Sequence, residues 1–327
     1  SFNIYCKDYG QWGDENQMRR PKNLISQELI QGLQRRRNDI GLVFLAGHLM
    51  TLLATGTLVN QAQGSGWWYF TLFLHGVCIV HLFAPFHEAT HKTAFASQKL
   101  NTLIAGFSGL MIMIPPQYFT MEHAAHHTYT QHPEKDPESI PMSGFFWGYL
   151  YYATAIPYFK GVIKNLSLLP LGKFSSSEKA FIPERHRKTV VRETRLMVVF
   201  YICLLVFSVV FQTGVVFWYW LMPRIIAEPL MRLIRISEHA SCEWVTDFRK
   251  NTRTTITIKP VCWLAWNMSF HAEHHAIPNM PFHKLPALHQ ELAPHLEHVD
   301  NGYLASHVNF LMKLLRKQFF PKTATTL

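Results

Sequence analysis

The chain has little cysteine, and its cysteines do not come in pairs. They lie far apart in the sequence, at Cys6, Cys78, Cys203, Cys242 and Cys262. Because no C-x-x-C pair is present, we expect neither a rubredoxin-type centre nor a cysteine-ligated zinc site. An odd number of cysteines gives no support to a disulfide framework, so we interpret all of them as thiols.

Charged residues are missing from two long stretches. None occurs in residues 40–60 or in residues 61–86, and each stretch can cross a hydrocarbon core, which needs roughly 20 residues. The hydrophobic fraction of 48% would also suit a soluble protein, so the arrangement, not the composition, predicts a membrane protein. The formal net charge of +10 then favours an anionic membrane face over nucleic acid as a partner. The polar opening stretch predicts no cleavable signal peptide.

The apolar runs predict four membrane spans. They cover residues 40–59, 67–86, 196–211 and 215 to about 234, with uncharged turns at 60–66 and 212–214. The last span contains Arg224, Glu228 and Arg232, which must face the protein interior or water. A single long tilted helix is the alternative to the last two spans.

Two further apolar segments, residues 100–119 and 144–162, are not expected to cross the membrane once. A single crossing by the first would separate two histidine-rich segments across the bilayer. We therefore predict that this segment, broken by Pro115 and Pro116, is re-entrant or interfacial. The basic segment 164–195 belongs in the cytoplasm by the positive-inside tendency, so the same prediction applies to 144–162. The catalytic site and both termini are then cytoplasmic.

The predicted fold class is an all-α integral membrane protein with about four transmembrane helices, interfacial helices and a cytoplasmic histidine-rich catalytic domain. Residues 1–39 form an N-terminal cytoplasmic or interfacial segment, 40–289 the membrane and catalytic body, and 290–327 a C-terminal cap. Leucines and isoleucines between Leu24 and Leu33 have the spacing of an interfacial helix, with a solvated helix as the alternative. The C-terminal cap is predicted as an amphipathic helix from Leu304, Val308, Leu311, Leu314 and Leu315.

Histidines occur in three short boxes whose spacing suits one face of a helix. The first box holds His87 and His91, the second His123, His126 and His127, and the third His271, His274 and His275. Neutral imidazole binds iron, zinc, copper and nickel, and eight imidazoles exceed what one ion can hold. The boxes therefore predict two metal ions.

Further candidates lie near the boxes. His239 follows the fourth predicted span and emerges on the same face as the boxes, so we expect it to be a ninth ligand. Ligation by nitrogen alone leaves the charge of the ions uncompensated, so carboxylates are expected to hold the ring N–H groups of the ligands. The candidates for that task are Glu88, Glu122, Glu273 and Asp136.

The three boxes, in this order, resemble the membrane fatty acid desaturase and hydroxylase family, whose pattern is HxxxH, HxxHH and HxxHH. The resemblance runs from about His81 to His289 and includes residues 126–138, 251–254 and 266–268. It implies a non-haem di-iron centre that uses O2 and two electrons to attack an unactivated C–H bond, giving a double bond or a hydroxyl group. The eight box histidines carry over as iron ligands, and His239 as an additional one. Many relatives have Asp where this chain has Glu88.

The resemblance also implies further residues and partners. Asp136 and Asn267 lie in the matching stretches and are predicted to be catalytic. The substrate is expected to be lipid-like, with a fatty acyl chain favoured. The chain shows no haem or iron–sulfur module of its own, so a ferredoxin, rubredoxin or cytochrome with its reductase is expected to supply electrons. The basic cytoplasmic face suits an acidic carrier.

Two alternatives come from other classes of protein. His87-Glu88-Ala89-Thr90-His91 also fits the HExxH pattern of intramembrane zinc metalloproteases, in which the glutamate activates water. That interpretation leaves both HxxHH boxes without a role. A non-enzymatic membrane metal carrier would bind metal reversibly through a histidine-rich face. Metal content and O2 consumption separate these alternatives from the oxidase.

Overall fold

The computed structural model describes residues 24–140 and 146–319, and its regular structure is almost entirely helical. In chain order, the N-terminal helices are α1 (Gln27–Leu33), α2 (Asn38–Ala62), α3 (Trp68–Val80), α4 (Phe83–Thr90), α5 (Gln98–Ile112), α6 (Pro116–Tyr129), α7 (Phe146–Ala153), α8 (Ile156–Leu168) and α9 (Ser176–Phe181). The remaining helices are α10 (Glu184–Val210), α11 (Met222–His239), α12 (Phe248–Asn251), α13 (Lys259–Leu264), α14 (His271–Ala276), α15 (Leu285–Leu292) and α16 (Tyr303–Phe319). Two short strands, β1 (Thr254–Ile256) and β2 (Val299–Asn301), pair in parallel.

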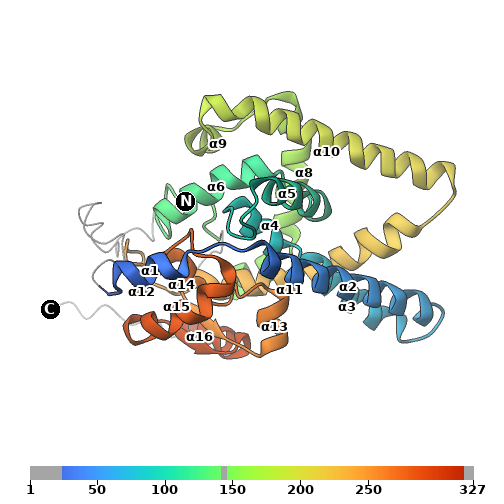
Figure 1. Ribbon diagram of the computed structural model, residues 1–327. Helices are drawn as coiled ribbons and strands as arrows, with labels where there is room; N and C mark the ends of the chain where they lie inside the picture. Colours follow the sequence, from blue (N-terminus) through green and yellow to red (C-terminus); the bar gives the residue numbers. More distant parts are fainter. Residues whose placement is uncertain (1–23, 141–145, 320–327) are drawn as a thin grey trace.

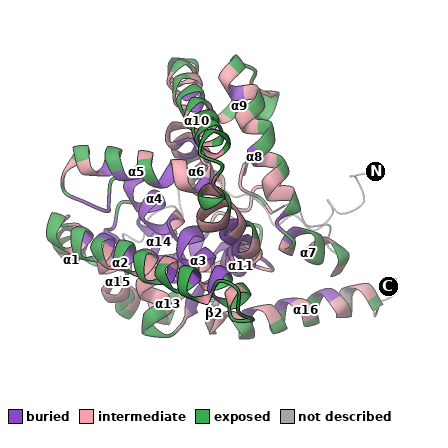
Figure 2. Ribbon diagram, turned by 90° about the vertical axis from the view of Figure 1, so that its right-hand side faces the viewer, coloured by how far each residue is buried: buried purple, intermediate pink, exposed green. Residues whose placement is uncertain are grey.

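Three helical segments are long and apolar enough to cross a membrane: α2, the α3–α4 segment Trp68–Thr90, and α10. They agree with the first three predicted spans, although the second extends into the first histidine box and the third begins earlier, at Glu184. Only 22% of the apolar window of α2 and 11% of that of α10 are buried, so both helices present apolar side chains outward, as lipid contact requires. Figure 2 shows the long exposed faces of α10 and α2. The protein is therefore a multi-pass membrane protein.

Helices α5 and α6 form a bent pair at the predicted break. They meet at an angle of 95° across Pro115 and Pro116. Met113, which ends α5, has a left-handed backbone with φ of 60°. Pro116 lies in the first turn of α6, where its missing N–H costs no hydrogen bond. Residues 100–119 thus do not form one straight helix. No helix in the described part of 144–162, residues 146–162, qualifies as a span.

The turn between α10 and α11 agrees with the prediction, whereas the predicted fourth span does not. Helix α10 begins at Glu184 and ends at Val210, and Gln212 has a left-handed φ of 49°. This turn excludes the single long tilted helix. A π-helical turn, Phe217–Leu221, leads into α11, whose charges place it outside the three apolar spans. Those charges face the interior as predicted, because Arg224 and Glu228 are almost fully buried and Glu228 pairs with Arg232.

Helix α11 packs closely against α3. Gly76 of α3 lies directly under Pro223, and a Cβ atom added to Gly76 would overlap the Pro223 carbonyl group. The absence of a side chain at Gly76 therefore sets the distance between the two helices. In Figure 1, α2, α3 and α10 extend to one side of the molecule, and α12, α14, α15 and α16 gather at the other.

Both end segments pack on the body. Ile30 of α1 is buried in one cluster with Leu285 and Leu288 of α15, so α1 is not a fully solvated helix. Helix α16 buries Phe310 and Leu314 against Tyr149, Tyr152 and Ile236. The predicted apolar face is right in part, because Leu314 is buried and Leu311 packs on the same cluster. Leu304 and Val308 do not belong to it, since they are 79% and 49% exposed. Contact with α7 and α11 selects a face shifted toward Phe310.

Candidate metal centre

The three histidine boxes lie on three different helices that converge inside the protein. The first box is on α4, the second on α6 and the third on α14. His239 is the last residue of α11 and joins them. All nine predicted histidines fall into two groups whose nitrogen atoms could each hold a metal ion.

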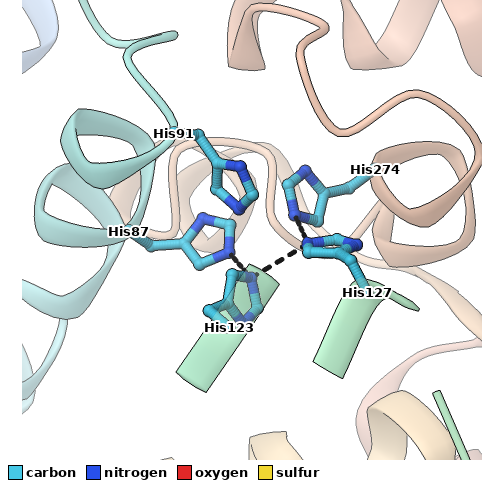
Figure 3. Close-up of side chains that lie close together, drawn as sticks. All are labelled: His87, His91, His123, His127 and His274. Carbon is cyan, nitrogen blue, oxygen red and sulfur yellow. Dashed lines mark hydrogen bonds between the residues drawn. The ribbon is translucent and has the colours of Figure 1, made fainter. Parts of the chain in front are cut away.

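The first histidine group combines all three boxes. It consists of His87, His91, His123, His127 and His274, and one nitrogen from each lies within 4.8 Å of the others. The Nε2 atom of His123 lies 2.7 Å from that of His87 and 3.0 Å from that of His127. The Nε2 atom of His274 lies 3.0 Å from that of His127. Figure 3 shows the five rings turned toward one another from α4, α6 and α14.

The second histidine group takes its members from α6, α11 and α14. It consists of His126, His239, His271 and His275. The Nε2 atom of His271 lies 3.1 Å from that of His239 and 3.2 Å from that of His275. The groups are adjacent, because the rings of His127 and His275 are only 4.3 Å apart at their centroids.

These nitrogen positions fit bound metal ions. Two imidazole nitrogens that each lie roughly 2.1 Å from one ion, at right angles, are about 3.0 Å apart. The observed Nε2 separations of 2.7 to 3.2 Å agree with that value. In addition, the buried Nε2 atoms of His91 and His126 have no hydrogen-bond partner among residues 24–140 and 146–319. Buried polar atoms rarely lack a partner, so a ligand such as a metal ion accounts for them.

Carboxylates hold the outer nitrogens of several of these rings. Nδ1 of His87 lies 3.2 Å from Glu88, and Nδ1 of His126 lies 2.9 Å from Asp136, as predicted for these two acids. A third carboxylate was missed: Glu138 lies 2.6 Å from Nδ1 of His123. A proton on each Nδ1 atom leaves Nε2 as the lone-pair nitrogen facing the centre. Glu138 stands two residues after Asp136, and that short acidic run was the available signal.

Three other predicted residues do something different. Glu122 makes no hydrogen bond to a histidine in the described parts of the chain. Adjacent residues of a helix point about 100° apart, so Glu122 faces away from the side chain of His123. It lines a cavity instead. Glu273 bonds to His289 and Thr254, which ties α14 to α15 and β1. Asn267 donates to the carbonyl of Phe282 and has a left-handed φ of 60°, so it shapes the turn before α14.

Arg235 connects the two groups. Its guanidinium pairs with Glu138, the partner of His123, and with Glu238, at 3.1 Å. Glu238 in turn lies 3.8 Å from Nε2 of His271 in the second group. The guanidinium of Arg235 therefore lies between two carboxylates, one near each histidine group. Its positive charge balances part of the negative charge of these carboxylates.

Burial keeps the third box neutral. Burial first, and then the neighbouring imidazoles, hold the pKa of His274 and His275 well below the usual value. Neutral rings keep the lone pairs that metal binding needs. Asp136 behaves in the opposite way. Burial acts to raise its pKa, but the neighbouring His126 and the backbone N–H of Gln131 outweigh burial and lower it, so the carboxylate stays ionised.

Comparisons with known proteins agree with this site. The family model described as Fatty acid desaturase matches residues 23–306. Sphingolipid delta(4)-desaturase DES1 of Pongo abelii is 30% identical over 272 residues, covering 82% of this chain and 76% of the relative. Sphingolipid delta(4)-desaturase/C4-monooxygenase DES2 of Rattus norvegicus is 25% identical over 293 residues, covering 87% and 84%.

Proposed function

This chain belongs to the fatty acid desaturase family, and from that premise we propose that it oxidises an unactivated C–H bond of a lipid-like substrate with O2 and two electrons. It is an oxidoreductase of the desaturase or hydroxylase type. The observation that carries the proposal is the convergence of nine histidines into two adjacent groups. The relatives' names include both desaturation and monooxygenation of sphingolipids, so they support a lipid substrate and leave either product open.

The cofactor in this proposal is a pair of non-haem iron ions. The first histidine group would hold one ion and the second group the other. When bound, the iron pair supplies the O2 activation that attack on a strong aliphatic C–H bond requires. Desaturation consumes one O2, two electrons and two protons and releases two waters. Hydroxylation has the same inputs but puts one oxygen atom into the product and releases one water.

The protein's own residues orient the ligands. Glu88, Asp136 and Glu138 accept the Nδ1–H groups of His87, His126 and His123, which fixes each ring and its tautomer. The hydroxyl of Thr130 and the backbone carbonyl of Asn251 do the same for His275 and His239. Such partners usually raise the basicity of the ligating nitrogen and hold its direction.

The surroundings also exclude water. Phe119 stacks on the ring of His123, with ring centroids 4.9 Å apart. Phe83 packs on the ring of His87, with ring centroids 5.8 Å apart. His87, His126, His271 and His274 are each about 1% exposed. A dry site protects an oxidising centre from side reactions until the substrate is in position.

Electrons would come from a separate ferredoxin, rubredoxin or cytochrome. We propose that it docks on the cytoplasmic side, to which we assign the catalytic site and both termini. The basic excess of the chain suits an acidic carrier. Residues 40–289 would form the catalytic body, with 1–39 as the N-terminal segment and 290–327 as the C-terminal segment. Added salt should weaken turnover supported by the carrier, and turnover that ignores salt would contradict this docking mode.

The protease alternative requires Glu88 to face a metal-bound water. The carboxylate of Glu88 instead contacts Nδ1 of His87 and accepts a hydrogen bond of 2.5 Å from Thr93, away from the centre. Both HxxHH boxes also contribute to the histidine groups. Because the chain belongs to a family of enzymes, the alternative of a non-enzymatic metal carrier has no support.

Three measurements test the proposal: the metal content of the protein, its O2 consumption and the lipid product. Purified protein is expected to hold two irons per chain and to consume O2 only with a reduced carrier and a lipid substrate. Lipids from cells that make the protein should contain an oxidised product that is absent from cells making His274→Ala. One zinc per chain, or identical lipids in the two strains, would refute it.

A further inference from the structure

A cavity of about 310 Å³ lies beside the first histidine group. It is lined by residues of α6, α8 and α11 and by the turn before α6, and it is partly open to the surroundings. Three of its lining residues each contact a histidine of the first group: Phe83 packs on His87, and Phe119 and Glu138 contact His123. The polar cavity, as we name it, is therefore one side chain away from the proposed metal centre.

A second, smaller cavity lies next to it. This inner cavity has a volume of about 20 Å³ and is lined by His87 of the first group and His271 of the second. Phe83 and Arg235 line both cavities, with the guanidinium 5.8 Å from the ring centroid. These two side chains therefore form part of the wall between the polar cavity and the space beside both histidine groups. A reacting carbon in the inner cavity would be close to whatever occupies the polar cavity.

The wall of the polar cavity is rich in hydrogen-bonding groups. Glu122 interacts with the hydroxyl of Tyr118, which also bonds to Asn165, and all three residues line the cavity. The guanidiniums in the wall already have partners, since Arg232 pairs with Glu228 and Arg235 with two other carboxylates. Glu122 has no ion pair among residues 24–140 and 146–319. Its carboxyl group is thus the acidic group in this wall that a ligand can engage.

A bare hydrocarbon would leave the polar groups of this wall poorly satisfied. Glu122, Tyr118 and Asn165 interact with one another, but each also lines the cavity. Removing water from such a group without a new partner costs about 1–3 kcal/mol. Apolar side chains such as Ile114 and Val162 complete the wall, and the cavity is partly open to the surroundings. A molecule can therefore place its polar end at Glu122 while its hydrocarbon tail leaves through the opening.

We propose that the polar cavity binds the polar end of the substrate and that Glu122 recognises a hydrogen-bond donor there, a hydroxyl or a protonated amine. The substrate is then an amphiphile oxidised close to its polar end, which excludes alkanes, carotenoids and acyl chains attacked in mid-chain. The inference rests on the proposed oxidase function, because only an oxidase would have a substrate whose polar end this cavity binds. Binding to the cavity itself is independent of turnover.

Binding should be measured on the purified full-length protein in detergent, without an electron donor, so that no probe is consumed. The probes are hexadecylamine, 1,2-hexadecanediol and 1-methoxyhexadecane, which share a C16 chain; the ether lacks a donor. Retained probe is quantified by mass spectrometry. The amine, the diol or both are expected to bind about tenfold more tightly than the ether, as one hydrogen bond to a carboxyl group predicts. The amine and diol results identify which donor is recognised.

Two variants locate the binding. Glu122→Met keeps the approximate length of the side chain, removes both acceptor oxygens and should remove most of the preference for the donor. Gly161→Leu should block all probes, because Gly161 lines the cavity and an added Cβ meets open space. The matched controls are Glu134→Met, an exposed acid outside the cavity, and Gly106→Leu, a helical glycine of α5 that also has open space. Unchanged iron content and melting temperature show that each variant is folded.

Equal retention of the three probes, or a donor preference that survives Glu122→Met, would overturn the inference even if the protein proves to be an oxidase. Loss of binding in the two control variants would also overturn it. Conversely, donor-selective binding without any oxidised product would leave the cavity assignment intact and refute the proposed function.

Discussion

His126 and His127 are consecutive residues of α6, yet their imidazoles belong to different histidine groups. Successive residues of a helix point about 100° apart, so two adjacent histidines can reach two neighbouring centres. His274 and His275 of α14 are divided between the groups in the same way. The paired histidines at the end of each HxxHH box therefore link the two proposed ion sites through one turn of helix.

This division predicts selective metal loss. His127→Ala should weaken the ion of the first group and His126→Ala that of the second, so each variant should retain about one iron where the wild-type protein holds two. Plasma mass spectrometry of the purified proteins measures the iron. Two irons in both variants would show that the groups do not bind metal as proposed.

Glu138 should be needed for metal retention although it is not assigned as a ligand. Glu138→Gln removes the charge that faces both His123 and Arg235, and loss of such a partner typically lowers metal affinity 10–100-fold. The rate of iron removal by a chelator gives the measurement. Glu134→Gln, four residues earlier and exposed, serves as the control. Equal rates in the two variants would contradict this role.

Gly76 should tolerate no side chain. In Gly76→Ala the new methyl group would overlap Pro223, forcing α3 and α11 apart, and overpacking of this kind costs about 1–3 kcal/mol. Gly106→Ala meets open space in α5 and should be neutral or stabilising by up to about 1 kcal/mol. Thermal unfolding in detergent compares the two. A melting temperature that is unchanged in Gly76→Ala would argue against the tight α3–α11 contact.

His283 should contribute to acid sensitivity. Burial, and then the nearby Lys284 and Arg37, lower its pKa to about 4, whereas an unfolded histidine titrates near 6.5. The unfolded chain therefore binds this proton more readily, so the contribution to stability is lost as the pH falls from about 6.5 to about 4. Between pH 7 and pH 5, the melting temperature of His283→Asn should fall less than that of the wild-type protein. An identical loss would rule out this contribution.

Much of the membrane organisation could be predicted from local sequence. Residues 40–59 and 67–86 were recognisable because a span needs only a sufficient run of apolar residues, and α2 and the α3–α4 segment contain those runs. The break at Gln212 and the bend at Pro115 and Pro116 were predictable because backbone preferences of turns and proline are local. The full contact face of α16 could not be predicted from local sequence, since residues of α7 and α11 select it.

The acids around the centre show the same limit. Glu122 stands beside His123 in the sequence, but the helix turns it into the polar cavity, and Glu138 reaches His123 from the following loop. Glu273 lies inside the third box and serves His289 and Thr254 instead. Of the four acids chosen by proximity in sequence, Glu88 and Asp136 therefore contact histidines of the boxes, whereas Glu122 and Glu273 have other surroundings.

By itself, the sequence determined the apolar spans and the three sets of histidines, because run length and the helical spacing of three and four residues are properties of a short segment. Tertiary structure alone decided which histidine joins which group, that Arg235 lies between them, and that a polar cavity adjoins the first. Those features depend on how α4, α6, α11 and α14, distant along the chain, pack side by side.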